Sequence, residues 1–327
     1  MNNRRKLIVG LGVVAVAAPL TCFAQQSVKI ARIGFLGSGS AANTATRVDA
    51  LRAGLRELGY VEGKNLIMEF RWAENNYDRF SELAAELVRL KVDLIVTHGT
   101  PGTRSAKQAT TTIPIVMAVS GDAVATGLIA SLARPGGNIT GTSFFSPELN
   151  TKQLEWLREC LPRIRRVAVL FNAGNSENAI SLEAMQVVAR SLKLELQPFG
   201  VRSPSAFANA FSEMSKRQVD ALAIIDDGMI IANAEALASL AAKHRIPASG
   251  FSAFAEQGGL MGYGVNFPAL FGRAAIFVDK ILKGAKPADL PTEQPTKFEL
   301  ILNMKTAQSL GIKFPQSLLI SATKVIE

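Results

Sequence analysis

Apolar and polar positions alternate along most of the chain in a pattern that predicts strands followed by helices. Residues 29–36 form a mostly apolar run that ends in Gly37 and Ser38, which is typical of a buried parallel strand. An apolar stripe at helical spacing follows over residues 48–58. The alternation continues in two successive series to about residue 263. We therefore expect an α/β protein with two doubly wound parallel-sheet lobes.

The order of the segments predicts that the chain passes between the lobes more than once. We expect the first crossing within residues 139–150 and a boundary near residues 266–267, so that a multi-stranded hinge joins the lobes. The predicted first lobe comprises residues 25–143 plus 267–300, and the second comprises residues 144–266 plus 301–327. A chain of 327 residues has room for two domains of ordinary size.

The first 24 residues have the features of a secretory signal. Three positive charges at residues 4–6 precede an uncharged stretch at residues 7–20, and Ala24 offers a cleavage point. The alternatives are an uncut membrane anchor, a twin-arginine signal, and lipid attachment at Cys22. We expect cleavage after Ala24 and a periplasmic protein. Cleavage removes three positive charges and no negative ones, so the net charge falls from +9 to +6 and Cys160 remains alone.

Several kinds of chemistry are missing from the sequence. The chain has only two histidines, His98 and His244, and no histidine or cysteine spacing typical of a transition-metal site. It contains no P-loop and no nucleophile elbow, and the glycines after residue 36 do not complete a dinucleotide fingerprint. The remaining positive charge is diffuse, which disfavours a nucleic-acid partner. We expect no cofactor, no metal and no catalytic group.

Small polar residues follow the predicted strands. In open parallel sheets, ligands bind outside the carboxyl ends of the strands, beside helix N-termini. Each of these residues could also be an ordinary helix cap or turn residue, but together they predict a binding cleft. Two aromatic residues could stack on an apolar part of a ligand. The candidate ligand-binding residues are Ser38, Gly39, His98, Gly99, Thr100, Ser120, Asp122, Asn172, Asn175, Asp226 and Asp227, with Phe144 and Phe251 as the stacking residues.

Several motifs together resemble one protein family. They are IGFL at residues 33–36, LRAGLRELGY at 51–60 with EGKN at 62–65, ARPGGNITG at 133–141, ILKGAKPADLP at 281–291, and NMKTA at 303–307. The chain resembles the substrate-binding proteins of ABC transporters that include tryptophan- and tyrosine-type members. The resemblance implies a type I periplasmic-binding-protein fold that closes over a ligand. Family binding positions match Ser38, Gly99, Thr100, Asp122, Asn172 and Asp226.

The main hypothesis is therefore an exported monomer that binds a small polar ligand, such as an amino acid, and delivers it to an ABC transporter permease. Asp122 would pair with a ligand amine, while Ser38, Thr100 and Asn172 would bind its carboxylate or polar groups. The small run at residues 39–42 departs from relatives specific for aromatic amino acids. The alternatives are an exported two-lobed hydrolase or transferase, for which His98 near Asp122 is the only support, and a ligand-sensing ectodomain.

Overall fold

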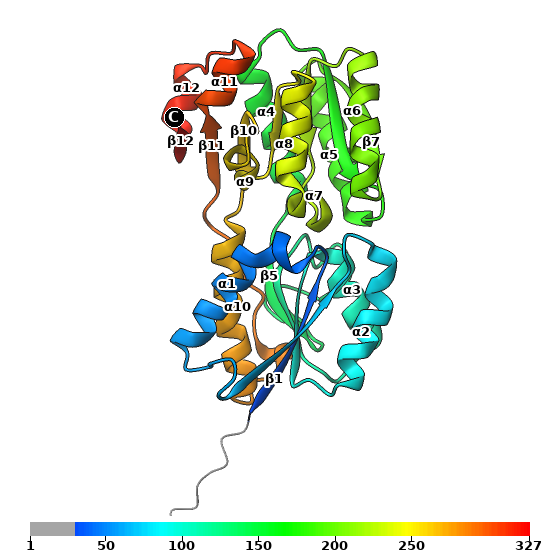
Figure 1. The fold of residues 1–327 in the computed structure, drawn as a ribbon. Coiled ribbons are helices and arrows are strands. Elements are labelled where there is room, and N and C mark those ends of the chain that lie inside the picture. The colour runs from blue at the N-terminus through cyan, green and yellow to red at the C-terminus, as the bar shows by residue number, and fades with distance from the viewer. Residues whose placement is uncertain (1–29) are drawn as a thin grey trace, which may run out of the picture.

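The computed structural model describes residues 30–327 as two α/β lobes stacked end to end (Figure 1). This arrangement confirms the predicted fold class. The predicted signal sequence, residues 1–24, lies outside the described residues. Over residues 30–327, no helix has both the length and the apolar character needed to span a membrane.

Lobe 1 is built on a five-stranded parallel sheet. Helices α1 (Ala41–Glu57) and α10 (Phe267–Leu282) cover one face. Helices α2 (Phe80–Arg89) and α3 (Gly99–Ala109) cover the other. Because both faces are covered, the central strands are mostly apolar, and the polar residues of β3 and β4 lie at their carboxyl ends. The order across the sheet is β2 (Leu66–Trp72), β1 (Ala31–Gly37), β3 (Leu94–His98), β4 (Ile115–Ser120) and β5 (Ile139–Ser143).

Lobe 2 is built on a seven-stranded sheet in which only the β10–β11 pair is antiparallel. The order is β12 (Lys324–Ile326), β11 (Glu299–Asn303), β10 (Met261–Gly264), β9 (Ala248–Gly250), β8 (Ala221–Ile224), β6 (Arg166–Asn172) and β7 (Glu195–Val201). Helices α4 (Ser146–Cys160) and α5 (Ser176–Ser191) pack on one face. The other face carries α6 (Phe207–Lys216), α8 (Ala234–Lys243) and α9 (Ser252–Glu256). The short α7 (Gly228–Ala232) faces lobe 1, and α11 (Met304–Leu310) and α12 (Gln316–Ser321) lie at the β12 edge (Figure 1).

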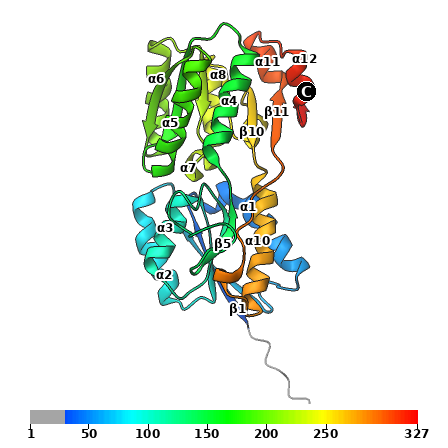
Figure 2. The same ribbon diagram turned by 180° about the vertical axis from the view of Figure 1, so that it is seen from behind.

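Three connections join the lobes. They run from β5 to α4, from β10 to α10, and from α10 to β11 (Figure 2). Helix α10 returns to lobe 1 and packs closely on α1, where a Cβ at Gly54 would lie only 2.6 Å from the Gly272 carbonyl oxygen. The first residues after β5 and β10 therefore lie at the boundary between the lobes.

Residues 139–143 form the fifth strand of lobe 1, and the first crossing follows them. One segment differs from its sequence pattern. The pattern of residues 126–133 predicts a short helix, but these residues form turns. Gly127 has a φ of +69°, and Asp122 Oδ1 accepts hydrogen bonds from the Val124 and Ala125 amides, so the backbone is held in a turn that cannot continue as a helix.

Candidate ligand-binding site

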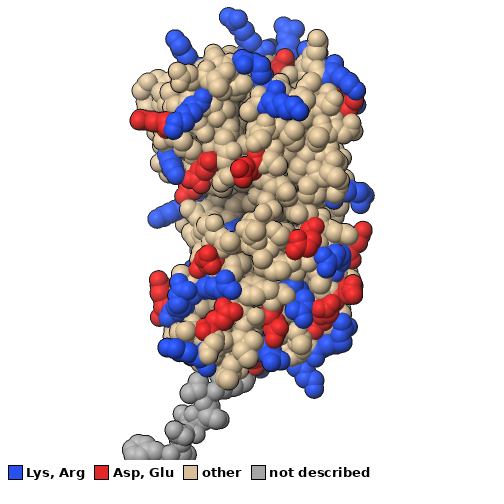
Figure 3. Space-filling model, in the orientation of Figure 1, with Lys and Arg blue, Asp and Glu red and all other residues tan. Residues whose placement is uncertain are grey.

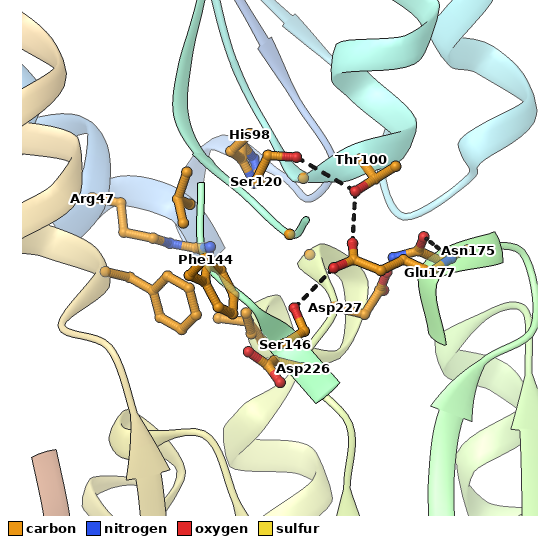
Figure 4. A pocket seen from close by; sticks show the side chains of 16 residues that line it. Arg47, His98, Thr100, Ser120, Phe144, Ser146, Asn175, Glu177, Asp226 and Asp227 are labelled. Atoms are coloured by element: carbon orange, nitrogen blue, oxygen red, sulfur yellow. Dashed lines mark hydrogen bonds between the residues drawn. The ribbon is translucent and has the colours of Figure 1, made fainter. Parts of the chain in front are cut away.

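A cavity lies between the lobes, at the carboxyl ends of strands from both sheets (Figure 4). The non-atom space among its lining residues is about 420 Å³ when the part open to solvent is included. A recess marks the junction of the lobes on the face shown in Figure 3. The position agrees with the rule that ligands of parallel α/β sheets bind beyond the strand ends.

The cavity brings together most of the residues expected from the sequence. From lobe 1 it is lined by His98, Gly99, Thr100 and Ser120. Phe144 lies in the first connection, and lobe 2 contributes Asn175, Asp226 and Asp227. Ser38, Gly39, Asp122, Asn172 and Phe251 lie outside the lining.

Ser38 and Gly39 lie where the two lobes touch each other. A Cβ at Gly228 would collide with the Ser38 hydroxyl, and a Cβ at Gly39 would lie 2.9 Å from that of Ala232. Both glycines thus permit a close approach of the lobes. Asn172 supports the cavity from behind, since its amide donates to Asp227 Oδ1 at 2.9 Å.

Phe251 lies in the core of lobe 2 and does not face the cavity. Its side chain is 1% exposed and packs against Phe254 and Phe267. Of these three rings, only Phe267 also lines the cavity. The aromatic contacts available to a ligand therefore come from Phe144 and Phe267.

The Asp122 carboxylate has a local role. Its Oδ1 accepts hydrogen bonds from the amides of Val124 at 3.1 Å and Ala125 at 2.9 Å, as a turn-capping aspartate does. Its backbone N–H donates across the lobe boundary to Glu177 Oε1 at 3.2 Å. Asp122 therefore contacts lobe 2 through its main chain, and its side chain stabilises its own turn.

Glu177 is a buried carboxylate within residues 172–178, whose polar sequence predicts a loop. It lies in the first turn of α5, which begins at Ser176, with Asn175 as the N-cap. Thr100 Oγ1 donates to Glu177 Oε2 at 2.6 Å, and Ser146 Oγ donates to Oε1 at 2.9 Å (Figure 4). Burial raises the pKa of Glu177, while these donors act in the opposite direction. The carboxylate binds lobe 2 to lobe 1.

Asp227 forms a second bridge between the lobes. The Tyr77 hydroxyl of lobe 1 donates to its Oδ1 at 2.8 Å, and the Asn175 amide donates to its Oδ2 at 3.0 Å. The carboxylate also caps α7 by accepting from the Met229 amide. Burial raises the pKa of both Asp227 and Tyr77. With these partners, Asp227 has its hydrogen bonds satisfied within the protein.

Asp226, the neighbouring residue, is in a different situation. It lines the cavity, and its Oδ1 has no hydrogen-bond partner within residues 30–327. Burial raises its pKa to about 7, and the charges of Glu177 and Asp227 add to the effect, while its own backbone amide and the Asn150 side chain act in the opposite direction. A buried acceptor without a partner is costly, and a ligand cation is a group that would satisfy it.

Arg47 lines the cavity but comes from the middle of α1. The rule that ligand-binding residues follow the strands of a parallel sheet therefore does not predict it. It lies on the buried stripe of that helix with Thr44, Val48 and Leu51 and is 7% exposed. Burial lowers its pKa to about 10, so it stays charged at neutral pH. A cation within an otherwise buried helical stripe is the sequence signal that could have found it.

His98 lines the same side of the cavity and is neutral. Burial and the nearby charge of Arg47 lower its pKa to about 3. Its Nε2 accepts a hydrogen bond from the Ser38 amide at 3.4 Å, so the proton of the neutral ring lies on Nδ1. In residues 30–327, no group of three or more His, Cys, Asp or Glu side chains is placed to hold a metal ion.

A two-lobed α/β fold with a polar cavity at the lobe boundary fits the family suggested by the sequence motifs. The family model described as "ABC transporter substrate binding protein" matches residues 36–326. The chain belongs to this family. It is thus a solute-binding protein of the ABC transporter type, and the interpretation of the sequence as such a protein is confirmed.

Similar proteins support this membership. A tyrosine-binding protein of Clostridioides difficile is 27% identical over 261 residues, which cover 79% of this chain and 74% of that protein. The ABC domain from Streptococcus pneumonia, solved with L-Trp, is 28% identical and superposes with a TM-score of 0.82 over 90% of this chain and 99% of that one. A conserved domain protein from Vibrio cholerae is 27% identical, with a TM-score of 0.83 over 91% and 100% of the two chains.

Proposed function

We propose that the protein is exported to the periplasm, binds one small amino-acid-like molecule between its lobes, and delivers it unchanged to an ABC transporter permease. The observation that carries the ligand class is the free carboxylate oxygen of Asp226 in the cavity. Export rests on the predicted signal sequence, residues 1–24, and the working unit is a monomer with no cofactor.

The roles of the three cavity carboxylates support a ligand with an ammonium group. Glu177 and Asp227 have their hydrogen-bonding capacity taken up by Thr100, Tyr77 and other donors of the protein. Asp226 alone of the three retains an oxygen without a partner in the described chain. The amine-binding role assigned to Asp122 from the sequence therefore passes to Asp226, because the Asp122 carboxylate is held by its own turn.

The rest of the lining supports an apolar portion next to the charged group. Phe144, Phe267 and Ile231 provide carbon surface on the walls of the cavity. Gly39 lies at the lobe contact and none of residues 39–42 lines the cavity, so this small run does not argue against an aromatic side chain. The tyrosine and tryptophan named for two relatives are therefore reasonable first ligands to test.

Reversible closure is the proposed mechanism. Glu177 and Asp227 each reach from lobe 2 to hydroxyls of lobe 1 and form bonds that are broken when the lobes separate. A ligand that contacts both lobes adds to these bonds and shifts the population toward the closed form, since it binds that form better.

The residues of the enzymatic alternative are arranged unfavourably for catalysis. The pKa of His98, lowered to about 3, makes it a poor general base at neutral pH. The Asp122 carboxylate is occupied by the Val124 and Ala125 amides. This supports binding without conversion.

The test is a thermal-shift and calorimetric screen of amino acids, small organic acids, amines and polyols against the purified mature protein. At a ligand concentration of a hundred times Kd, binding should stabilise the folded state by about 2.7 kcal/mol. A screen in which no compound raises the melting temperature, or in which a bound compound is converted to a product, would overturn the proposal.

A further inference from the structure

Arg47 carries a positive charge that the protein itself leaves unbalanced. Its guanidinium donates from Nη2 to the Asn43 carbonyl oxygen of the same helix at 3.0 Å, and it lies 6.0 Å from the centre of the Phe271 ring. It forms no ion pair with any residue of the described chain. A buried guanidinium with five N–H donors and one hydrogen bond carries a desolvation cost that the Asn43 carbonyl and the Phe271 ring offset only in part.

The arginine extends into the cavity from the side of lobe 1, near Phe144 (Figure 4). The other cations of the same helix behave differently. Arg52, for example, is partly exposed and pairs with Glu62 at 3.0 Å and Asp49 at 3.4 Å. The position of Arg47 is thus specific to the cavity and not a general property of α1.

A second feature of the same wall favours negative charge. Helix α3 begins at Gly99, directly after β3, and no side chain caps its N-terminus. Gly99 and Thr100 both line the cavity, so the first turn of this 11-residue helix lies at its wall. The helix dipole and the N–H groups of a first turn attract an anion, and the Glu177 carboxylate, which accepts from Thr100 Oγ1 at 2.6 Å, already lies beside this turn.

His98, the residue that precedes this helix, adds a neutral donor. Because Nε2 accepts from the Ser38 amide, the Nδ1–H group of His98 is available to donate. No partner for it is seen in residues 30–327. Arg47, His98 and the start of α3 therefore offer hydrogen-bond donors on one wall, while Asp226 offers an acceptor from lobe 2.

We propose that Arg47, with His98 and the α3 N-terminus, forms a carboxylate-binding subsite that restricts the cargo to molecules carrying an anionic group. The inference rests on the proposed function and deepens it. The ligand carboxylate binds to lobe 1 and its ammonium group binds to Asp226 of lobe 2, so that the two charges of a zwitterion connect the lobes. Uncharged solutes and simple amines leave Arg47 unsatisfied and are rejected.

The experiment is calorimetric titration at pH 7.5 with matched ligands. The probes are L-tryptophan and L-tyrosine, their carboxamides, tryptamine and tyramine, and myo-inositol as an uncharged polyol. The amides and amines keep the cation and the aromatic ring but lack the carboxylate. We expect the better-bound amino acid to bind at least 100-fold more tightly than its amide and its amine.

Variants of α1 connect this preference to Arg47. Arg47→Gln should lower the affinity for the amino acid at least 100-fold and leave the affinity for its amide within threefold. Arg47→Lys keeps the charge but loses the planar guanidinium with its paired N–H donors. This variant should lower the affinity for the amino acid about tenfold. Arg52→Gln removes the same charge from the same helix outside the cavity and should leave every affinity unchanged.

A stability measurement separates a ligand-binding role from a structural one. If Arg47 serves only the ligand, Arg47→Met should raise the melting temperature of the ligand-free protein and abolish the rise caused by the amino acid. Circular dichroism confirms that each variant is folded. A lowered melting temperature of ligand-free Arg47→Met would show a structural role and overturn the subsite.

The outcomes for the subsite and for the proposed function are distinguishable. Equal binding of an amino acid and its amide, tightest binding of myo-inositol, or full affinity in Arg47→Gln would overturn the subsite while a solute-binding function stands. If no probe binds and a wider screen of small solutes is also negative, the proposed function fails and the subsite fails with it.

Discussion

The Tyr77 hydroxyl of lobe 1 lies 2.8 Å from Asp227 Oδ1 of lobe 2 and donates a hydrogen bond to it. The same hydroxyl oxygen accepts from the Met229 amide at 3.0 Å, at the start of α7. One phenol thus joins the segment between β2 and α2 to the tip of the second sheet. In the proposed mechanism this contact forms when the lobes close and breaks when they open.

Removing this hydroxyl should weaken binding. Tyr77→Phe should reduce ligand affinity about fivefold to tenfold, because a buried hydrogen bond contributes about 1 kcal/mol to the closed form. Tyr60→Phe is the matched control, since the Tyr60 hydroxyl donates to Asp279 at 3.1 Å within lobe 1. The control should lower thermal stability with no change in affinity, and equal effects of the two variants on affinity would contradict the role of Tyr77 in closure.

Gly121 should be essential for closure, because a Cβ at this position would collide with the Glu177 carboxylate. Gly121→Ala should leave each lobe folded but hold the lobes apart, with ligand affinity reduced at least 30-fold. Small-angle X-ray scattering should show an open form that ligand does not compact. Gly137→Ala is the control, since a Cβ there would meet nothing within 4 Å. Compaction of Gly121→Ala by ligand would contradict the role of this close contact in closure.

Binding of a cationic ligand should depend on pH through Asp226. Its pKa in the ligand-free protein is raised to about 7, and only the ionised carboxylate attracts an ammonium group. Affinity should therefore fall by up to about tenfold for each pH unit below 7. Asp226→Asn should bind more weakly and with a flatter pH profile in calorimetry.

Asp122→Asn distinguishes the two candidate carboxylates. Asparagine caps a turn as aspartate does, so this variant should retain wild-type affinity and the wild-type pH profile. Loss of binding in Asp122→Asn, with normal binding in Asp226→Asn, would return the amine-binding role to Asp122.

The Asp226 carboxylate should also affect the stability of the ligand-free protein. The folded protein keeps the Asp226 proton up to about pH 7, whereas the unfolded chain releases it near 3.8. The contribution of protonated Asp226 to the free energy of unfolding should therefore be fully present below about pH 4. It should be lost as the pH rises to 7. Asp226→Asn should be more stable than wild type at pH 8 by about 1–4 kcal/mol in urea unfolding. A less stable variant at pH 8 would contradict the burial of an uncompensated charge.

Sequence reasoning found the fold because strand and helix periods are local properties of the chain. It predicted the position of His98, Thr100 and Asp226 in the cavity lining because residues at the carboxyl ends of buried strands lie at the edge of the sheet. It could not tell Asp226 from Asp122, since the difference lies in which tertiary partners each carboxylate finds. Phe251 follows a strand as well, yet its ring packs against Phe254 in the core.

The residues that were missed come from helices. Arg47 projects from the side of α1 and Glu177 from the first turn of α5, so neither follows a strand in the sequence. Each becomes part of the site only when the two lobes and their helices are packed together. An isolated charge on a buried helical stripe, as at Arg47, is a pattern that would have pointed to the site before the structure.

The most direct test of the central claim is native mass spectrometry of the mature protein from a mild preparation, followed by analysis of the released small molecule. The account predicts one bound molecule per chain, carrying both an ammonium and a carboxylate group, and recovered chemically unchanged after incubation with the protein. An uncharged cargo would contradict the assigned charges of the cavity. Conversion of the molecule to a product would contradict the binding function itself.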